Sequence, residues 1–405
     1  MQEAVIVATA RSPIGRAFKG SFVHVRPDDL AAAVVRAALE KIPSLDPLEI
    51  DDVLLGCGQP AGTSGFNLGR VVAVLLGLDS IPGVTVNRYC ASSLQTTRMA
   101  FHAIRAGEGD VFISAGVETV SQFDKGSADS LPNTKNPLFA AAESMTAMYA
   151  AENGEWVNPR ERGLLPNIYT AMGQTAENLA KIKGISRTDQ DAYAVSSQSR
   201  AEIAVKSGFW ARDLVPITLG DGTVVSRDDC PRAGVTLDGL SQLKPAFRTT
   251  GTVTAGNCCP LNDGAAALVI MSAGKAAELG LTPLARILAT GVSGISPELM
   301  GYGPVEATRQ ALGHAGMTIS DIDLFEINEA FAAQVIPSAR DLGIDFDKLN
   351  VNGGAIALGH PFGMTGARIT STLINALQER DEQFGLETMC VGGGQGMAMI
   401  IERLS

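Results

Sequence analysis

The sequence predicts an α/β fold in which two similar βαβ-type halves pack in layers, with a large loop-domain insertion between their strands. Three observations support this. Short apolar runs alternate with helical patterns along the chain. The last third weakly repeats the pattern of the first, and the middle region has a different composition. The chain has 405 residues, of which 45% are hydrophobic and 19% charged, enough for two or three packed units.

The first part of the chain reads as a regular series of strands and helices. Strands are expected at residues 5–8, 53–56, 84–86 and 111–116, the last of which is continuously apolar and therefore buried. Helical spacing covers residues 28–39, and a second helix runs from about 91 to 105 and stops at Gly107. This alternation is typical of parallel strands joined by helices.

Residues 121–248 hold clusters of Pro, Asn, Asp and Arg, an amphipathic stretch at 189–207 and a turn at 220–222. We interpret this segment as an insertion that carries ligand-facing loops; the alternative is a structural lid or an oligomer surface. Strands resume at 265–271. The expected organisation is an N-terminal half of residues 1–120 plus 249–273, a loop domain of residues 121–248 and a C-terminal half of residues 274–405.

The last third of the chain repeats three segments of the first. Residues 349–352 match 84–87, residues 324–327 resemble 53–56, and residues 389–393 resemble 112–116. This weak internal duplication indicates two similar α/β halves packed together.

Charge and cysteine content narrow the class of protein. The net charge of −11 argues against a nucleic-acid binder, although a phosphate-bearing small ligand remains compatible with a few local cations. No signal peptide is expected from the first residues, and no run of about 18 apolar residues predicts a membrane span. The six cysteines are scattered without a CxxC pair, which favours a reduced, cytoplasmic enzyme without a metal centre.

Cys90 is the first candidate for chemistry. It follows a strand end and a tight connection and stands at the start of the predicted helix 91–105. Backbone N–H groups and the helix dipole at such a place favour an anion, so we expect a stabilised, nucleophilic thiolate. The alternative is a buried structural cysteine.

His360 is the candidate base. It lies on a Gly-rich turn within residues 352–368, before a predicted helix. Its side chain can accept a thiol proton near neutral pH. Of the other three histidines, His102 falls inside a helix and His314 near a helix end, where both are structural or exposed.

Two further segments accompany these residues. The Gly-rich run after Cys390 is a poor phosphate cradle because a strand at 397–401, not a helix, follows it; a turn that aims N–H groups at Cys90 fits better. Asn328, at a strand end, could hold a water or polarise a carbonyl, but local sequence alone favours a helix N-cap. Residues 255–265 are expected to form a loop close to a ligand, and Cys57 and Cys230 are expected to be structural.

These motifs together resemble the thiolase family of acetyl-CoA acetyltransferases and 3-ketoacyl-CoA thiolases. The matching segments, in family order, are TARSPIGRAFKG at 9–20, VNRYCASSLQ around Cys90, GTVTAGN at 251–257, INEAF at 327–331, NVNGGAIALGHPFGMTGAR at 350–368 and CVGGGQGMA at 390–398. The resemblance spans almost the whole chain and implies a thiolase-like fold.

The resemblance also implies residue roles. Cys90 is the acylated nucleophile, His360 its base and Cys390 the acid/base at the α-carbon. Asn328 with His360 holds one oxyanion site, and the N–H groups of Cys90 and Gly392 hold the second. The implied substrate- and coenzyme A-binding positions are Met172, Arg232, Phe247, Ala255, Cys259, Ala330 and Phe331.

The implied activity is that of an acetyl-CoA C-acyltransferase, which cleaves 3-ketoacyl-CoA thiolytically or runs the reverse condensation, in fatty acid β-oxidation. Coenzyme A is a co-substrate, no cofactor is tightly bound, and a homotetramer or dimer is implied. A short-chain biosynthetic acetoacetyl-CoA thiolase is the alternative. Ala171 stands where many short-chain biosynthetic members carry His, and Cys259 where many members carry Ser, so these two positions leave the chain length and the direction open. Three other classes fit the residues less well. Ketoacyl synthases usually pair Cys with two His, whereas Cys390 stands at the second acid/base position here. A non-catalytic scaffold would not need Cys90, Asn328, His360 and Cys390, and a cysteine hydrolase would leave Cys390 without a role.

Overall fold

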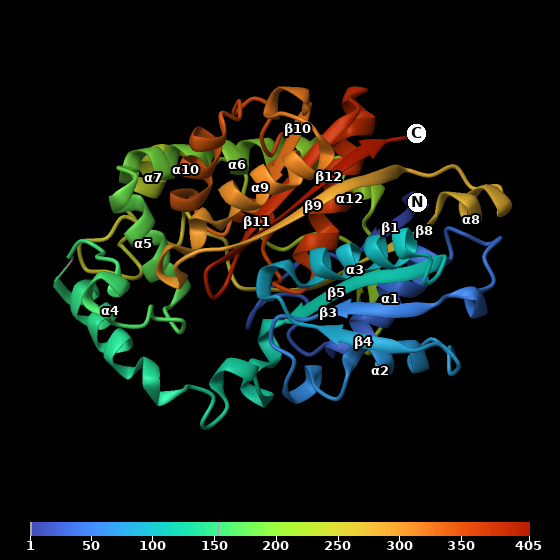
Figure 1. Cartoon of the computed structure of the whole chain (residues 1–405), viewed down its shortest axis with the longest axis horizontal. Helices are drawn as coiled ribbons and strands as arrows, with labels where there is room; N and C mark the ends of the chain where they lie inside the picture. Colours follow the sequence, from blue (N-terminus) through green and yellow to red (C-terminus); the bar gives the residue numbers. More distant parts are fainter. Residues whose placement is uncertain (1, 153) are drawn as a thin grey trace.

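A computed structural model describes residues 2–152 and 154–405; Met1, where the expected N-terminal segment begins, and Asn153, inside the expected insertion, lie outside the described residues. One ten-stranded sheet runs through the described chain in the order β10-β11-β12-β9-β1-β8-β5-β3-β4, with the short strand β2 (Gly15–Arg16) paired to β8 (Figure 1). The α/β class predicted from the sequence is confirmed.

The N-terminal half supplies one side of this sheet. Its strands are β1 (Ala4–Arg11), β3 (Asp52–Gly56), β4 (Gly83–Val86), β5 (Val111–Thr119) and β8 (Asn262–Ser272). Its helices are α1 (Pro27–Leu39), α2 (Leu68–Leu75) and α3 (Ser92–Ala106), followed after β8 by α8 (Ala273–Glu278). Gly107 ends α3 in the left-handed region, with φ of 79°, which a residue without a Cβ adopts freely.

The C-terminal half supplies the other side. Its strands are β9 (Ala285–Gly294), β10 (Leu324–Ile327), β11 (Phe384–Val391) and β12 (Gln395–Arg403). Its helices are α9 (Gly303–Ala315), α10 (Ala332–Leu342), the short α11 (Ala355–Leu358) and α12 (Thr365–Arg380).

The two halves repeat one topology. In the first, β1 and β5 flank β8 antiparallel, and β3 pairs parallel with both β5 and β4. In the second, β9 and β11 flank β12 antiparallel, and β10 pairs parallel with β11. The second half has no strand equivalent to β4 among its described residues. Leu349 takes that place and makes a single parallel bridge to Phe325, as β4 pairs with β3. The duplication expected from the sequence is therefore present.

The strand registers correct one detail of that expectation. When Val53 is matched with Leu324, the ladder pairs Leu55 with Ala115 and Glu326 with Glu387. Strands β5 and β11 do correspond, but Met389 matches Val117 rather than Phe112. The sequence comparison matched the Gly-rich ends of the two segments and was five residues out of register.

The helices form layers on the two faces of the sheet. Alternate strand residues such as Leu54, Leu268 and Met389 face one central core, which also contains the inner faces of α3 and α12. The opposite face of the first half packs against α1 and α2, and that of the second half against α9 and α10. This alternation follows from the period of two along each strand.

Helices α3 and α12 approach each other closely in the central layer. A Cβ added at Gly366 would lie 2.2 Å from the backbone nitrogen of Leu94, and the Ala367 N–H donates to Ser93 Oγ at 2.9 Å. The helix starts that follow Cys90 and His360 are thus in direct contact.

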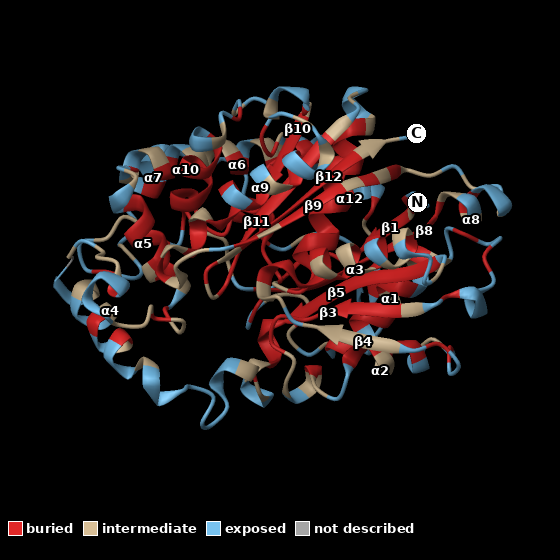
Figure 2. Cartoon of the chain, viewed as in Figure 1, coloured by how far each residue is buried: buried red, intermediate tan, exposed pale blue. Residues whose placement is uncertain are grey.

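A long insertion, residues 120–261, connects β5 to β8. It contains α4 (Ala140–Glu152), α5 (Met172–Ile182), α6 (Arg187–Ser207), α7 (Leu237–Ser241) and the hairpin of β6 (Ile217–Thr218) and β7 (Val224–Val225). The predicted amphipathic stretch is α6, whose start is fixed by a capping box between Ser186 and Asp189. Figure 2 shows most strands of the large sheet as buried, β4 as intermediate and α4 as mainly exposed.

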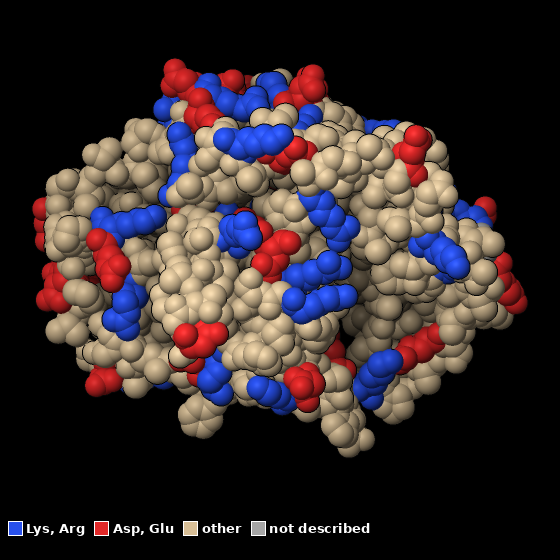
Figure 3. Space-filling view, turned by 180° about the vertical axis from the view of Figure 1, so that it is seen from behind, with Lys and Arg blue, Asp and Glu red and all other residues tan. Residues whose placement is uncertain are grey.

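Within residues 2–152 and 154–405, the model contains no helix with both the length and the apolarity that a membrane span requires. Figure 3 shows acidic and basic side chains interspersed over one face of the molecule.

Candidate active site

Cys90 lies on a strained turn between β4 and α3. A 3-10 turn, Tyr89–Ala91, precedes the helix, and Tyr89 has a φ of 43°, which is unusual for a residue with a side chain. The turn is held from both sides, because the Tyr89 N–H donates to Asn87 Oδ1 at 2.8 Å and Ser92 Oγ donates to the Tyr89 carbonyl at 2.7 Å. Such over-determined strain is common where a reactive group must be presented.

The environment of the Cys90 thiol differs from the sequence expectation. Burial raises the pKa of this thiol to about 12, against the lowering effect of hydrogen bonds from the Gly392 and Cys90 N–H groups. Desolvation outweighs the helix start, so the resting side chain is a thiol rather than the expected thiolate. It therefore needs a base when it reacts.

His360 is held in one orientation by two neighbours. Its Nδ1 lies 2.6 Å from Thr365 Oγ1, and Thr365 Oγ1 itself donates to the Pro361 carbonyl at 2.8 Å. Because that hydroxyl has a single proton, Nδ1 must carry the hydrogen and donate to Thr365. Nε2 then has the free lone pair and accepts from Asn328 Nδ2 at 3.2 Å. Burial lowers the pKa of His360 to about 3, with a contribution from Arg368, so the imidazole is neutral at rest.

Asn328 does not cap a helix, contrary to the preference from local sequence. The N-cap position of α10 belongs to Phe331, three residues later. The Asn328 N–H donates to the Thr388 carbonyl at 3.0 Å, which extends the β10–β11 pairing to the strand end. Its side-chain Oδ1 is buried without a partner among the described protein atoms. An amide in this state is suited to hold a water or a substrate oxygen.

Cys390 ends β11 and is fully buried. Burial raises the pKa of its thiol well above the ordinary value, and the Cys90 thiol adds to the rise, which places the two sulfurs within electrostatic reach. After Val391 the chain turns at once through Gly393 and Gly394, both with φ of 79°. This turn aims the Gly392 N–H at Cys90, as predicted for the Gly-rich run.

A pocket of about 380 Å³ opens onto Cys90. Its wall includes Phe362, whose ring packs edge-on against His360 at 5.2 Å between ring centroids. The full lining is Gln59, Tyr89, Cys90, Asp129, Thr134, Lys135, Ile168, Tyr169, Thr170, Met172, Phe362, Gly392 and Gly393. Residues from the first half, the insertion and the second half thus share one cavity.

The substrate positions implied by the resemblance divide into two groups. Met172 lines the pocket, and it packs in one cluster with Ala330, Phe331 and Cys390. Phe247 stacks edge-on against Phe331 at 6.1 Å.

Of the remaining implied positions, Cys259 lies close to the same cluster, because its N–H donates to the Ala330 carbonyl at 3.1 Å and its thiol is electrostatically coupled to Cys90 and Cys390. Arg232 and Ala255 are exposed. The Arg232 N–H donates to Gln198 Oε1 at 3.1 Å.

Several site residues had no signal in the sequence reading. Thr365 stands five residues after His360 in the segment 350–368, but its contact with His360 depends on the turn between them. Gln59, Asp129 and Glu118 reach the site only through tertiary packing. No local pattern distinguishes them from ordinary polar residues.

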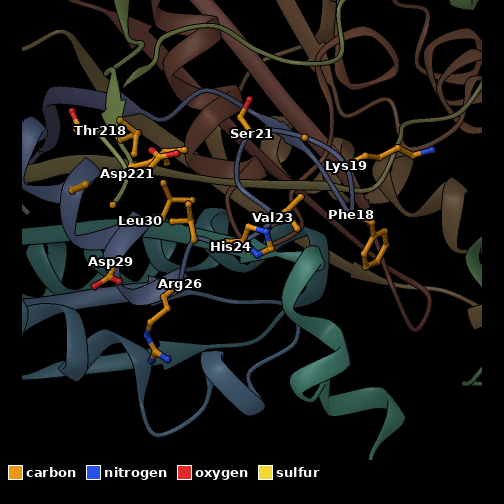
Figure 4. Close-up of a pocket in the computed structure, with 16 residues that line it drawn as sticks. Phe18, Lys19, Ser21, Val23, His24, Arg26, Asp29, Leu30, Thr218 and Asp221 are labelled. Carbon is orange, nitrogen blue, oxygen red and sulfur yellow. The ribbon is translucent and has the colours of Figure 1, made fainter. Parts of the chain in front are cut away.

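A larger surface groove, of about 940 Å³, is lined by residues other than Cys90 and Cys390 (Figure 4). It is lined by the loop around His24, by α1 and by the β6–β7 hairpin. Its charges are mixed, with Lys19 and Arg26 beside Asp29 and Asp221, and Arg26 is paired with Asp28. We take the smaller pocket as the candidate active site because Cys90 lines it and Phe362, which packs against His360, forms part of its wall. Among the described residues, no group of three or more metal-ligating side chains converges.

Comparison with known proteins agrees with this geometry. A model of the thiolase N-terminal domain matches residues 4–274, and a model of the thiolase C-terminal domain matches residues 281–403. A 3-ketoacyl-CoA thiolase of Bacillus subtilis is 43% identical over 99% of this chain and 100% of its own length. A 3-oxoadipyl-CoA/3-oxo-5,6-dehydrosuberyl-CoA thiolase of Escherichia coli is 44% identical over the full length of both chains.

Among solved structures, the Bacillus anthracis acetyl-CoA acetyltransferase superposes with a TM-score of 0.86 at 39% identity, covering 100% of this chain and 99% of that one. Two family models that together span nearly all residues, and relatives that match end to end, lead to one conclusion: this chain belongs to the thiolase family.

Proposed function

We propose that the protein is an acetyl-CoA C-acyltransferase that cleaves 3-ketoacyl-CoA to acetyl-CoA and a shortened acyl-CoA, or runs the reverse condensation, through an acyl-enzyme on Cys90. The observation that supports this proposal is the electrostatic coupling of two buried cysteines from distant parts of the chain, together with a buried, neutral histidine whose Nε2 carries the lone pair. A thiol that must be deprotonated, a neutral base and a second thiol are the groups that this reaction needs.

In the first step, the Cys90 proton moves to His360 Nε2 and the sulfur attacks the 3-keto carbon. The Thr365 contact favours this direction, because it places the hydrogen of the resting imidazole on Nδ1. The new oxyanion needs donors aimed at it. Each such donor contributes on the order of 3 kcal/mol in comparable sites.

In the second step, the bond between the α and β carbons breaks and the acetyl-CoA enolate takes a proton from Cys390. Asn328 Nδ2 and the protonated His360 donate to one oxyanion in this scheme, and the N–H groups of Cys90 and Gly392 donate to the other; the Asn328–His360 contact and the Gly392 hydrogen bond to Cys90 support these roles. The raised pKa of the buried Cys390 keeps its proton in place until the carbanion forms.

In the third step, free coenzyme A enters. The Cys390 thiolate takes the coenzyme A thiol proton, the coenzyme A sulfur attacks the acyl-Cys90 carbonyl, and the shortened acyl-CoA leaves. His360 returns its proton to Cys90, which restores the resting enzyme. The kinetics should be ping-pong, because the first product leaves before the second thiol binds.

The wider context is part of the same proposal. We place the enzyme in the cytoplasm, in fatty acid β-oxidation, as a homotetramer or dimer with coenzyme A as co-substrate and no tightly bound cofactor. Residues 121–248 are proposed as the loop domain between halves formed by 1–120 plus 249–273 and by 274–405. Met172, Phe247, Ala330 and Phe331 would contact the acyl unit, and Arg232, Ala255 and Cys259 the coenzyme A.

Acylation of Cys90 is the direct test. Incubation of the wild-type protein with acetoacetyl-CoA, followed by peptide mass spectrometry, should find an acetyl adduct on Cys90, and Cys90→Ala should abolish thiolysis. The matched control is Cys230→Ala, a buried cysteine that only accepts from Asn262 Nδ2. An adduct on another cysteine, or full activity of Cys90→Ala, would remove the assignment.

The same assay separates the alternatives. Acyl release without coenzyme A would indicate a cysteine hydrolase, and no turnover of any thioester would indicate a scaffold. A series of 3-ketoacyl-CoA chain lengths distinguishes a general thiolase from a short-chain acetoacetyl-CoA enzyme by where kcat/KM peaks.

A further inference from the structure

A buried carboxylate at the end of β5 joins two loops of the site. Glu118 is fully buried, and its Oε2 accepts from the Gly58 N–H at 2.8 Å and from the Gly363 N–H at 2.9 Å. Its Oε1 accepts from the Gln59 N–H at 3.1 Å. One side chain therefore satisfies three backbone donors from two segments that are distant in sequence.

Both segments contribute to the wall of the Cys90 pocket. Gly363 follows Phe362, which contacts His360 and lines the pocket. Gln59 lines the pocket as well and donates to Asp129 Oδ2 at 2.6 Å, while Asp129 Oδ1 accepts from the Tyr89 hydroxyl at 3.1 Å. Tyr89 immediately precedes the nucleophile. Glu118 thus connects to the histidine loop on one side and to the strained cysteine turn on the other.

The packing around Glu118 leaves little freedom. A Cβ at Gly58 would lie 2.9 Å from Glu118 Oε2 and 3.1 Å from the Phe362 Cβ. A Cβ at Gly363 would lie 2.3 Å from the Val117 carbonyl oxygen. The backbones of both loops pack directly against the end of β5. The Glu118 carboxylate accepts the hydrogen bonds of the loop N–H groups there.

We propose that Glu118 is a positioning residue of the acyl-transfer site, whose ionised carboxylate fixes the His360 loop relative to the Cys90 turn. This inference rests on the proposed function. A displacement of about 1 Å between reacting groups can slow an enzymatic step by as much as 10²-fold, so a tie of this kind has a measurable effect on rate.

The ionisation of Glu118 gives the role a pH signature. Burial raises its pKa to about 7, against three lowering backbone hydrogen bonds. The titratable groups facing it are the Cys57 thiol, 3.8 Å from Oε1, and the Cys90 thiol, whose pKa its charge raises. Below pH 7 one oxygen gains a proton and can no longer accept from the backbone donors. Loop positioning, and with it kcat, should decline as the pH falls through 7.

The test compares Glu118→Gln with Asp263→Asn. Asp263 is a fully buried carboxylate on the neighbouring strand β8, and it accepts hydrogen bonds from the Ser121 N–H and Oγ. For Glu118→Gln, kcat of acetoacetyl-CoA thiolysis should fall by about 10-fold to 100-fold with KM changed by less than about 3-fold, and the pH dependence near 7 should disappear. Asp263→Asn should keep both the rate and the pH profile.

Each outcome bears on a definite claim. Unchanged kcat and an unchanged pH profile in Glu118→Gln would overturn the role of Glu118 while leaving the proposed function intact. If that variant does not fold, Glu118→Asp decides, because a shorter carboxylate cannot reach all three donors; wild-type kinetics in Glu118→Asp would overturn the proposal. A wild-type protein without thiolysis and without a Cys90 adduct would instead defeat the proposed function itself.

Discussion

The two halves of the chain share one strand order but differ at the ends of equivalent strands. In the second half, β11 passes to β12 through the tight turn 392–394, whereas in the first half the equivalent connection from β5 to β8 is the insertion 120–261. By strand register, Cys390 corresponds to Glu118 and Asn328 to Cys57. The second half carries the proposed acid/base Cys390 and the proposed oxyanion residue Asn328 at these positions, and the first half carries a carboxylate and a thiol that contact each other.

The difference separates chemistry from support. The Cys390 thiol faces another thiol, while Glu118 is surrounded by backbone N–H groups. Paired residues inside the sheet differ as well. The apolar pair Leu55 and Ala115 of the first half is replaced by the two carboxyl side chains of Glu326 and Glu387 in the second. A duplicated framework can thus place reactive groups on one copy and hold them with the other.

The largest effect should come from removing the thiol of Cys390. Cys390→Ala should slow carbon–carbon cleavage by about 10²-fold to 10⁴-fold, because the enolate loses its proton donor, while acylation by a simple thioester changes far less. Cys57→Ala, at a buried thiol of the other half, should leave both rates within about 3-fold. Rapid-quench assays of the two half-reactions measure this split; equal slowing of both by Cys390→Ala would contradict it.

An intermediate effect is expected at Thr365, the residue of the second half whose hydroxyl accepts the hydrogen bond from His360 Nδ1. Thr365→Val keeps the shape but removes the acceptor for His360 Nδ1–H, so the tautomer with a free Nε2 loses its advantage. We expect kcat to fall by roughly 10-fold to 100-fold, in the range seen when an orienting partner is lost. Thr365→Ser should restore most of the rate. If Val and Ser behave alike, packing rather than the hydroxyl is responsible.

The smallest effect concerns stability. Burial raises the pKa values of Glu326 and Glu387 to about 8, so the folded state binds their protons more tightly than the unfolded chain. Between about pH 4.5 and 8 this lowers stability as the pH rises. Glu387→Gln should therefore gain in Tm relative to wild type, by a few degrees more at pH 8 than at pH 5.

Glu379→Gln, at an exposed carboxylate on α12, is the control for this measurement and should show the same Tm difference at both pH values. A Glu387→Gln difference that does not grow with pH would mean that Arg368 neutralises the pair fully. Differential scanning calorimetry in two buffers is sufficient.

Much of the fold followed from local patterns. Apolar runs located β3, β5, β10 and β11, and the duplication was visible at 53–56 and 324–327. The five-residue register error at β11 arose because glycines match glycines in any sequence, while only the ladder defines which residues are opposite. The insertion was recognised by composition, but its helices α4 and α5 were not.

The candidate site was partly visible for a physical reason. Cys90 stands at a helix start, His360 on a Gly-rich turn and Cys390 just before a Gly-rich run; these contexts are local, so the sequence alone singles the three residues out. The sequence alone could not predict the protonation states, because burial rather than the helix start determines the pKa of the Cys90 thiol. The N-cap preference for Asn328 was wrong because the helix begins only after Phe331. Contacts such as Glu118 with Gly363 depend on which loops meet in space.

The contact of α3 with α12 at Leu94 and Gly366 also bears on how the molecule becomes active. The sulfurs come from the first and the last quarter of the polypeptide, so a nascent chain stays inert until its C-terminal strands have been synthesised and docked. Pairings between such remote segments form slowly, because loop closure must precede any gain. During refolding, enzymatic turnover should return later than the far-ultraviolet dichroism signal of the helices.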